Sequence, residues 1–394
     1  MEDKWWVSHF NYLDEITKEY SLPNKLKIYD VTLRDGEQSP GVVFRKEDKI
    51  KIAQKLDELG VQRIEGGMPV VSDDDKEAIK EIVNLGLTSD IWGFCRCIKS
   101  DVDACIDVGV DSVICEIATS KPKFQAYGLT EEKVLSRAVD TLEYAKDHGL
   151  YTAFFSVDMT RSDLNFLKKI NNAALEEGKA DELVLVDTLG VATPEAIYYL
   201  TKQFKNWFDV PLHIHCHNDF GLGTACELAA IKAGAEWAHT SLNGLGEKTG
   251  NTDLAELVLS AYILYGLDSG LTYEKLVESS KLIEKLSGVK VPAYKPVVGD
   301  NVFTRESGVT VLQLIRYPPA VEGYAPELVG GERSIVLGKK SGRHSINWKL
   351  EELGINASEE QIAKILDQVK QKSIDKKGLI TDSEFKSIVN EVLT

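Results

Sequence analysis

Short apolar runs alternate with longer amphipathic runs along most of the chain. The longer runs repeat apolar residues at the spacing of one helix face, as in residues 46–59, 130–148 and 253–264. The short runs are typical of buried strands and occur at residues 26–33, 61–66, 90–96, 111–117, 151–157, 182–187, 211–217 and 236–242. This repeated alternation, without a hairpin signal, predicts an α/β fold, a parallel (β/α)8 TIM barrel rather than an open doubly wound sheet.

Polar residues gather where the predicted strands end. In such a barrel the carboxyl ends of all strands meet at one face, and the βα loops there carry the active site. The residues at these ends are Arg34-Asp35-Gly36-Glu37-Gln38, Glu65 to Pro69, Arg96, Thr119-Ser120, Ser156 with Asp158, Asp187-Thr188, His215 to Asp219, and Asn243 to Asn251. The sequence therefore predicts a polar site at this face.

The alternation stops after about Leu286, which divides the chain into three predicted parts. Residues 1–25 carry several aromatic side chains among charges and are expected to dock on the body or on a partner subunit. Residues 26–286 form the predicted catalytic barrel. Residues 287–394 begin with a proline-rich stretch and end in short helices, one of them after an N-cap signature at Ser358. Because the helical tail is smaller than a typical domain, we expect an extension that packs across a homodimer or a dimer-based homo-oligomer.

Composition limits the class of partner. The 394-residue chain carries a formal charge of −16, which argues against nucleic acid or an anionic membrane surface as the main partner. No window approaches eighteen uninterrupted apolar residues, and the N-terminus lacks the layout of a signal peptide. The six cysteines lack zinc-knuckle spacing and suit reduced thiols. We therefore expect a cytoplasmic protein that acts on small molecules.

The predicted seventh strand carries three histidines on one side. His213, His215 and His217 alternate with apolar residues, so they share one face of the strand. They are either satisfied core and turn residues or, in part, ligands of a divalent ion together with Asp35 at the end of the first strand. Asn251 can add a neutral oxygen ligand. Such a site keeps positions open, and a 2-oxo acid that chelates through its carboxylate and keto oxygens fits them.

Two arginines and a glycine-rich loop extend this predicted site. Arg34 either polarises a keto oxygen electrostatically or forms an ion pair with Glu37 or Glu65 in the barrel mouth. Arg96 either binds a second substrate carboxylate bidentately or forms a surface or intersubunit ion pair. Residues 244–251 lie where strands seven and eight of such barrels often hold phosphate groups, so an acyl-CoA can bind there.

Four motifs together resemble the acyl-CoA-dependent Claisen-condensing synthases. This barrel family includes isopropylmalate, citramalate and homocitrate synthases and, more distantly, hydroxymethylglutaryl-CoA lyase. The motifs are VTLRDGEQSPG at 31–41, DTLG at 187–190, HCHND at 215–219 and NGLGEKTGN at 243–251. The run LGKKSGRH at 337–344 also resembles a family stretch. The residues Gly41-Val42-Val43-Phe44 resemble the homocitrate and Re-face citrate synthases most, as does the lack of a long regulatory domain.

The resemblance implies a reaction and a role for each motif. A proton leaves the methyl group of the thioester, the carbanion adds to the ketone, and the thioester is hydrolysed. The implied ligands of a divalent ion (Mn, Mg, Zn or Co) are Asp35, His215, His217 and Asn251. The catalytic candidates are Arg34, Glu37, Gln38 and Asp158. The substrate-binding candidates are Arg96, Thr188, Gly244, Gly246 and Glu247. With Arg96, the resemblance favours a dicarboxylic acceptor such as 2-oxoglutarate or oxaloacetate.

Three departures from the family pattern leave the proton-transfer set incomplete. Thr310 stands where the family usually has a histidine that reaches into the partner's site, and a threonine hydroxyl is no general base at neutral pH. Lys123 stands where a histidine usually follows the fourth strand, and the acid pair after the fifth strand is reduced to Asp158. Either Asp158, Lys123, Glu247 or Tyr324 substitutes, or the thioester or the reaction differs from the common type.

Four functions follow from these observations. The first is a metal-dependent condensation of acetyl-CoA or another acyl-CoA with a 2-oxo acid, of the homocitrate- or citrate-synthase type. The second is an isopropylmalate- or citramalate-type synthase. The third is a retro-Claisen or aldol lyase, against which the loop after the eighth strand has no cysteine. The fourth is a non-catalytic metal-binding relative, against which the intact ligand set argues.

Overall fold

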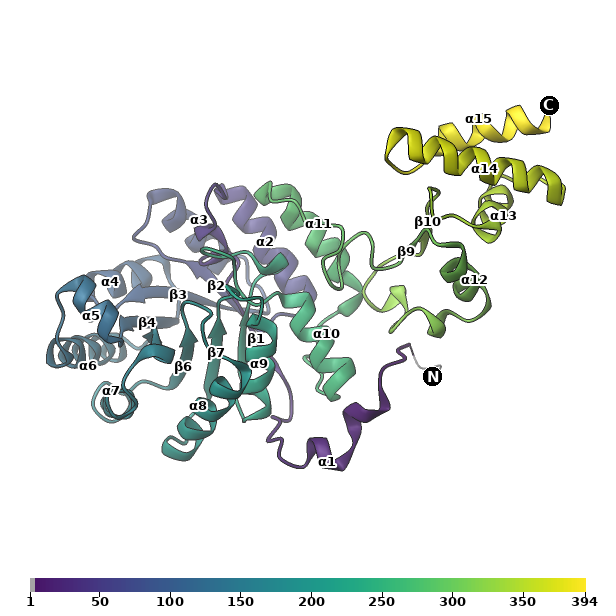
Figure 1. Cartoon of the computed structure of the whole chain (residues 1–394). Coiled ribbons are helices and arrows are strands. Elements are labelled where there is room, and N and C mark those ends of the chain that lie inside the picture. Colours follow the sequence, from purple (N-terminus) through teal and green to yellow (C-terminus); the bar gives the residue numbers. More distant parts are fainter. Residues whose placement is uncertain (1–3) are drawn as a thin grey trace. The chain divides into compact units, whose positions relative to one another are not determined.

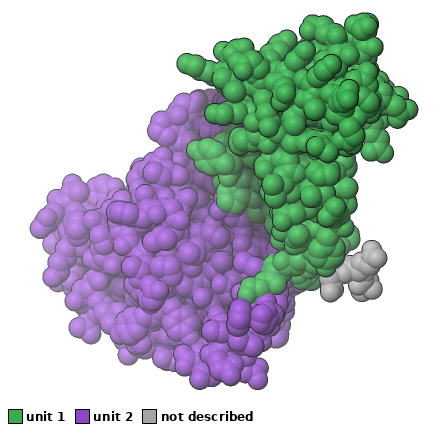
Figure 2. Space-filling model, turned by 45° about the vertical axis from the view of Figure 1, so that its right-hand side comes forward, with its two compact units in different colours: residues 1–8, 291–394 green, residues 9–290 purple. Residues whose placement is uncertain are grey.

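The computed structural model describes residues 4–394, which fall into two compact units (Figure 2). The barrel unit comprises residues 9–290. The C-terminal unit comprises residues 291–394 and the described residues up to Ser8. Each unit has its own core and is described by itself.

The barrel unit contains a closed ring of parallel strands that run in the order β1 to β8 (Figure 1). Each strand pairs with its neighbour in the chain, and β1 closes the ring by pairing with β8, with Lys27 beside Trp237. The strands are β1 (Lys27–Asp30), β2 (Arg63–Gly67), β3 (Asp90–Arg96), β4 (Ser112–Ala118), β5 (Tyr151–Val157), β6 (Glu182–Asp187), β7 (Leu212–Cys216) and β8 (Trp237–Thr240). The predicted TIM barrel and its predicted strands are confirmed.

Helices follow the strands and surround the ring. Their starts are fixed by side chains that accept the first free backbone N–H groups, such as Ser72 before α3 and Thr130 before α6. The helices are α1 (Asp14–Thr17), α2 (Lys46–Leu59), α3 (Asp73–Asn84), α4 (Lys99–Val108), α5 (Lys121–Tyr127), α6 (Glu131–Asp147), α7 (Leu164–Glu176), α8 (Pro194–Trp207), α9 (Gly223–Lys232), α10 (Leu254–Tyr265) and α11 (Leu276–Ser287). The predicted helices at 46–59, 130–148 and 253–264 correspond to α2, α6 and α10.

Alternate residues of the strands fill the barrel interior, because successive side chains of a strand point to opposite faces. The apolar interior cluster is Tyr29, Val31, Trp92, Phe94, Ile114, Ala153, Phe155, Val184, Val186 and Trp237. At the amino ends of the strands a buried ion pair joins Arg63 NH1 to Glu182 at 2.6 Å. His213 Nε2 lies 2.7 Å from the same carboxylate, so this histidine is a satisfied core residue. The opposite face is left for polar residues of the βα loops.

Residues 9–25 lie on the helices of the barrel unit. The hydroxyl of Tyr12 donates to the carbonyl of Ile263 in α10, and Ser21 N donates to the carbonyl of Lys232 at 2.8 Å. In the C-terminal unit, Trp6 N donates to the carbonyl of Gly323 at 2.7 Å. The first three residues of the predicted docking segment lie outside the described residues.

The C-terminal unit is mostly helical. Its core is an apolar cluster that includes Ile346, Ile365 and Val389. Its elements are β9 (Thr304–Arg305), α12 (Gly308–Arg316), β10 (Ser334–Ile335), α13 (Arg343–Glu352), α14 (Glu359–Lys376) and α15 (Asp382–Leu393). Ser358 caps α14, as its sequence signature predicts. Among residues 4–394, no helix is long and apolar enough to cross a membrane.

Candidate metal and active site

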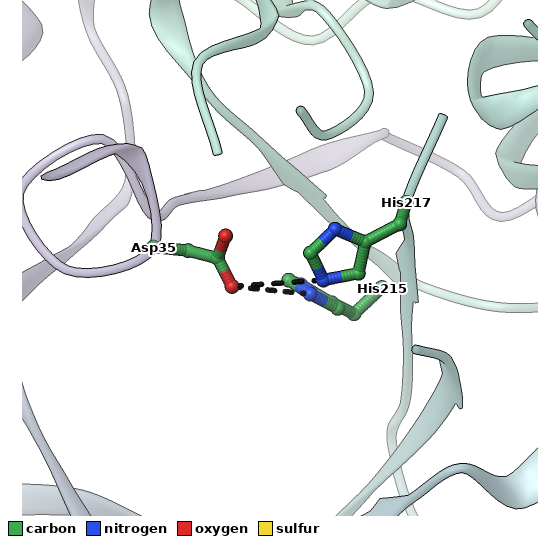
Figure 3. A group of neighbouring side chains, drawn as sticks. All are labelled: Asp35, His215 and His217. Atoms are coloured by element: carbon green, nitrogen blue, oxygen red, sulfur yellow. Dashed lines mark ion pairs between the residues drawn. The ribbon is translucent and has the colours of Figure 1, made fainter. Parts of the chain in front are cut away.

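Asp35, His215 and His217 point toward one another at the carboxyl-terminal face of the barrel (Figure 3). Asp35 follows β1, His215 belongs to β7, and His217 directly follows β7. Oδ2 of Asp35 lies 3.7 Å from Nε2 of His215 and 3.8 Å from Nε2 of His217. All three side chains are buried. The structure thus brings together three of the four predicted metal ligands around one point.

The loop after β8 holds Asp35 in place. Oδ1 of Asp35 accepts hydrogen bonds from Glu247 N at 3.1 Å and from Asn251 Nδ2 at 3.0 Å. Gly246 lies directly against this contact: an added Cβ would collide with Asn251 Nδ2 and lie 3.0 Å from Asp35 Oδ1. Asn251, the fourth predicted ligand, therefore faces Asp35 with its nitrogen, while its Oδ1 is buried without a partner among the described residues.

The loop after β6 positions the backbone of His217. His217 N donates to the carbonyl of Asp187 at 3.2 Å. Gly190 has φ +57°, and a Cβ there would lie 2.6 Å from the carbonyl oxygen of His217. A side chain at Gly190 would be strained by its backbone angle and would also displace His217.

Protonation of the three side chains suits cation binding. Burial alone would raise the pKa of Asp35, but the charge of Arg34, joined at low pH by those of protonated His217 and His215, holds it below its usual range. Burial lowers the pKa of His217, and lowers that of His215 well below its ordinary value. At neutral pH the site therefore presents one carboxylate and two neutral imidazoles.

These groups fit a divalent ion. The Nδ1 atoms of His215 and His217 are buried without a hydrogen-bond partner among the described residues, and their Nε2 atoms lie beyond hydrogen-bonding distance of Asp35. Two ligands bound at about 2.1 Å to one ion lie about 3 to 3.5 Å apart, so the Asp35 oxygen and each imidazole nitrogen, at 3.7 and 3.8 Å, are close to the separation that an ion requires. A carboxylate oxygen and two imidazole nitrogens are ordinary ligands of such ions.

Arg34 lies beside this cluster. Its NH1 is 2.8 Å from Asp35 Oδ2, and its Nε is 2.5 Å from Glu65 Oε2. Its guanidinium carbon lies 4.0 Å above the ring of Phe94, within the range of a cation–π contact. NH2 of Arg34 has no partner among the described residues. Arg34 therefore forms the predicted ion pair with Glu65 and still keeps one N–H donor free, so it can also interact with a keto oxygen.

Asp158 and Thr188 belong to a neighbouring hydrogen-bond network. Asp158 is fully buried and accepts from Arg161 Nε at 2.8 Å and from Arg161 NH2 at 2.6 Å, as well as from Ser120 Oγ. Its backbone N donates to Thr188 Oγ1 at 2.7 Å. Because this oxygen accepts, the hydroxyl proton of Thr188 remains free to donate.

The other candidates from the sequence lie farther from the cluster or have other partners. Glu37 accepts from Lys49 Nζ at 2.6 Å and from Phe44 N at 2.8 Å, and Gln38 is exposed. Arg96 pairs with Asp101 through two contacts of 2.7 and 3.0 Å. In the structure, Glu37 and Arg96 thus form ion pairs with Lys49 and Asp101 of the same chain.

Within the loop after β8, Gly244 and Gly246 provide backbone contacts. The carbonyl of Gly244 accepts from Asn251 N at 3.0 Å, and Gly246 N donates to Ser39 Oγ at 2.9 Å. The side chain of Glu247 is 56% exposed. The loop is therefore a rigid turn joined to the loop after β1, with one exposed carboxylate on it.

Sequence reasoning did not single out several of these contacts. Phe94 under Arg34, and Arg161 beside Asp158, lack a motif of their own, whereas Ser120 belongs to the polar strand ends singled out from the sequence. The period-two alternation of β3 is the signal that could have placed Phe94 inside the barrel. In the C-terminal unit, Thr310 Oγ1 donates to the carbonyl of Ser307 at 2.8 Å.

Comparisons with known proteins agree with this geometry. The HMGL-like family matches residues 25–283, and a family described as homocitrate synthase post-HMGL domain-like matches residues 297–377. Homocitrate synthase AksA of Methanopyrus kandleri is 43% identical over 383 residues, which cover 97% of this chain and 96% of that protein.

Relatives with other acceptors match at similar identity. The 2-isopropylmalate synthase of Methanocaldococcus jannaschii is 42% identical over 95% of this chain and 73% of its own length. The (R)-citramalate synthase CimA of the same organism is 43% identical over 93% of this chain and 74% of its own length. Among solved structures, the HMG-CoA lyase of Bacillus subtilis matches with a TM-score of 0.62 at 20% identity, over 69% of this chain and 96% of that chain, which supports the fold.

Proposed function

The chain belongs to the HMGL-like family as a divalent-metal-dependent synthase that condenses acetyl-CoA with a 2-oxo acid, and we propose that its acceptor is a dicarboxylic 2-oxo acid such as 2-oxoglutarate or oxaloacetate. Two findings favour this acceptor class. The homocitrate synthase AksA is similar over nearly the whole length of both chains. The part of this chain after the barrel also matches a domain named after homocitrate synthase.

The observation that carries the function is the cluster of Asp35, His215 and His217 with Arg34 beside it. We propose that the first three residues, together with Asn251 after a turn of its amide, hold the divalent ion. Such an ion polarises a keto group as a Lewis acid. The two imidazole ligands favour Zn or Co, whereas the carboxylate and amide oxygens also suit Mn or Mg.

Residues of the chain itself supply the remaining interactions with the acceptor. Arg34 keeps NH2 free, so its positive charge can stabilise the negative charge that grows on the keto oxygen during attack. The free hydroxyl proton of Thr188 can donate to the acceptor's carboxylate. We assign Arg96 to a second carboxylate of the acceptor, in exchange for Asp101.

The acyl-CoA is assigned to the loop after β8. Residue 247 of this loop contacts Asp35, so a thioester bound to the loop would lie next to the acceptor site. The backbone N–H groups of Gly244, Gly246 and Glu247 already donate to Ser241, Ser39 and Asp35, so we assign these residues to the lining around the thioester rather than to phosphate binding.

An isopropylmalate- or citramalate-type acceptor is the second candidate. The two relatives with those names are as similar in identity as the homocitrate synthase. The 2-oxo acid acceptor of this second class has an apolar side chain, whereas the dicarboxylic acceptor carries a second carboxylate. The interior residues Phe94 and Phe155 favour such a side chain and make this candidate worth testing.

The experiment is a thiol-release assay with metal-loaded protein, acetyl-CoA and a panel of 2-oxo acids. We expect the largest kcat/KM with 2-oxoglutarate or oxaloacetate. A larger value with pyruvate or 2-oxoisovalerate would replace the first candidate by the second. No release with any acid, while the protein binds its metal, would refute the synthase function altogether.

We further propose a cytoplasmic homodimer. The six cysteines are free and buried, as suits a reducing compartment. In the C-terminal unit, α12 and the next turn leave Val309, Ile315 and Tyr317 exposed, and exposed apolar groups of this kind favour association with a second copy. Light scattering should give a mass of twice 43.7 kDa, and a Tyr317→Glu variant should lower it.

A further inference from the structure

Glu116 projects into the barrel interior from the middle of β4. Its register partners are Arg96 on β3 and Phe155 on β5, and Phe155 belongs to the interior cluster. Ile114, two residues earlier on the same strand, belongs to that cluster too, so the alternation of the strand places Glu116 on the inner face. Its side chain is partly exposed, and no hydrogen bond or ion pair joins its carboxylate to another described residue. A carboxylate on the inner face of a barrel without a partner is unusual, because charges removed from most of the solvent are normally paired.

The surroundings of Glu116 suit a base. Burial raises the pKa of its carboxyl, and the negative charge of Asp101 raises it further. The positive charges of Arg34, Lys123 and Arg96, in that order, lower this pKa, but burial has the larger effect. Arg34, the strongest of these charges, is the residue that lies against Asp35. Arg34 thus acts on the pKa of Glu116, and it keeps its NH2 without a partner among the described residues.

Other carboxylates of the barrel interior have partners. Both oxygens of Asp158 accept hydrogen bonds from Arg161. Glu65 pairs with Arg34 and accepts from Tyr29, and Asp187 accepts from Thr160 and from Ala192 N. Among the sequence candidates, Glu247 is more than half exposed and lies 4.0 Å from Lys248. Of these carboxylates in the described part of the barrel, Glu116 is the inward one with neither a hydrogen-bond nor an ion-pair partner.

We propose that Glu116 is the general base that removes a methyl proton of acetyl-CoA, an inference that rests on the proposed function. An Oε of Glu116 takes the proton, and the electron pair of the broken C–H bond forms the new C–C bond to the keto carbon. The π pair of the ketone moves to its oxygen, which takes the proton back from the Glu116 carboxylic acid. Water then attacks the thioester carbon and the C–S bond breaks. One proton of the water passes to the sulfur, which leaves as the CoA thiol, and the other is released to solvent as the new carboxyl group ionises.

The test compares Glu116→Gln with Glu143→Gln, which changes an exposed glutamate of α6 in the same chemical way. The assay measures thiol release with metal-loaded protein, acetyl-CoA and the best acceptor of the panel. We expect Glu116→Gln to lower kcat about 10²- to 10⁴-fold, with the KM of the acceptor within about threefold of the wild type. Metal content, thermal midpoint and the kinetics of Glu143→Gln should match the wild type.

A second variant separates proton transfer from a merely structural role. Glu116→Asp withdraws the carboxylate by one methylene, so it should slow proton removal and give a larger rate difference between CH3- and CD3-acetyl-CoA than the control variant. If Glu116→Gln does not fold, the isotope effect of Glu116→Asp alone tests whether Glu116 removes the proton. A kcat of Glu116→Gln within tenfold of the wild type, or an isotope effect of Glu116→Asp equal to that of Glu143→Gln, would overturn the assignment. Inactive wild-type protein would instead refute the proposed function itself.

Discussion

Oδ2 of Asp35 lies 3.7 Å from Nε2 of His215, although Asp35 belongs to the loop after the first strand and His215 to the seventh strand. The closed ring makes this contact possible, because it brings the carboxyl ends of all strands to one face. One oxygen of Asp35 is bound by the loop after β8, and the other faces the two histidines. The contact therefore depends on loops from three parts of the chain.

Removal of a ligand should remove the metal. Asp35→Asn and His217→Ala should each lower metal affinity on the order of 100-fold or more, since one donor of three is lost and a buried donor set is left incomplete. Metal analysis after dialysis measures the effect. His148→Ala, which changes an exposed histidine after α6, is the control and should keep the wild-type metal content. Full metal content in both ligand variants would contradict the assignment.

Arg34→Lys should lower kcat about 10²- to 10³-fold. A lysine has one ammonium group and cannot contact Glu65, Asp35 and a keto oxygen at the same time, as the planar guanidinium can. Steady-state kinetics with the preferred 2-oxo acid measure the loss. The exposed Arg137→Lys is the matched control. Equal kcat values for the two variants would exclude an electrostatic role of Arg34.

The barrel and its strand ends could be predicted from the sequence because both depend on local patterns. Eight apolar runs correspond to β1 to β8, and motifs at their ends place Asp35, His215 and His217 at one face. Gly190 and Gly246 belong to those motifs, and the close backbone approaches at these two positions explain why no side chain is present.

The partners of charged side chains could not be predicted, because they depend on which residues of distant strands become neighbours. The pairing of Arg96 with Asp101 and that of Glu37 with Lys49 illustrate this limit. Glu116 lies in an apolar run without a motif, and only the register of β4 shows that it faces the interior. A candidate proton-transfer group of this kind can be identified only from the three-dimensional structure.

Asp30 should make stability depend on pH near neutrality. Burial raises the pKa of Asp30 to about 7. Its unfolded value is about 4, so the folded state binds the extra proton between these values, and stability falls as pH rises from about 4 to about 7. Asp30→Asn should remove this slope and raise the free energy of unfolding at pH 8 by up to about 4 kcal/mol.

Urea unfolding of Asp30→Asn and wild type at pH 5 and pH 8 measures this effect. The exposed Asp209→Asn should keep the wild-type pH dependence. A wild-type stability that rises between pH 5 and pH 8, with the same rise in Asp30→Asn, would contradict the prediction.

The ion pair at the amino ends of the strands should stabilise the fold without affecting chemistry. Burial would raise the pKa of Glu182, but His213 and Arg63 lower it to about 2. The stabilisation is therefore present above about pH 4.3 and is lost as pH falls toward 2. Glu182→Gln should cost about 3 to 5 kcal/mol at pH 7, because it leaves the Arg63 charge buried without its partner. Unchanged stability of Glu182→Gln at pH 7, or a large loss of kcat in the folded variant, would be inconsistent with this role.

The most direct test of the central claim is an anomalous-difference map from crystals of the wild-type chain grown with Mn²⁺. We predict one strong peak at about 2.0 to 2.2 Å from Asp35 Oδ2, His215 Nε2 and His217 Nε2. A peak elsewhere, or none at this position in crystals shown to contain the metal, would contradict a metal site between the first and seventh strands.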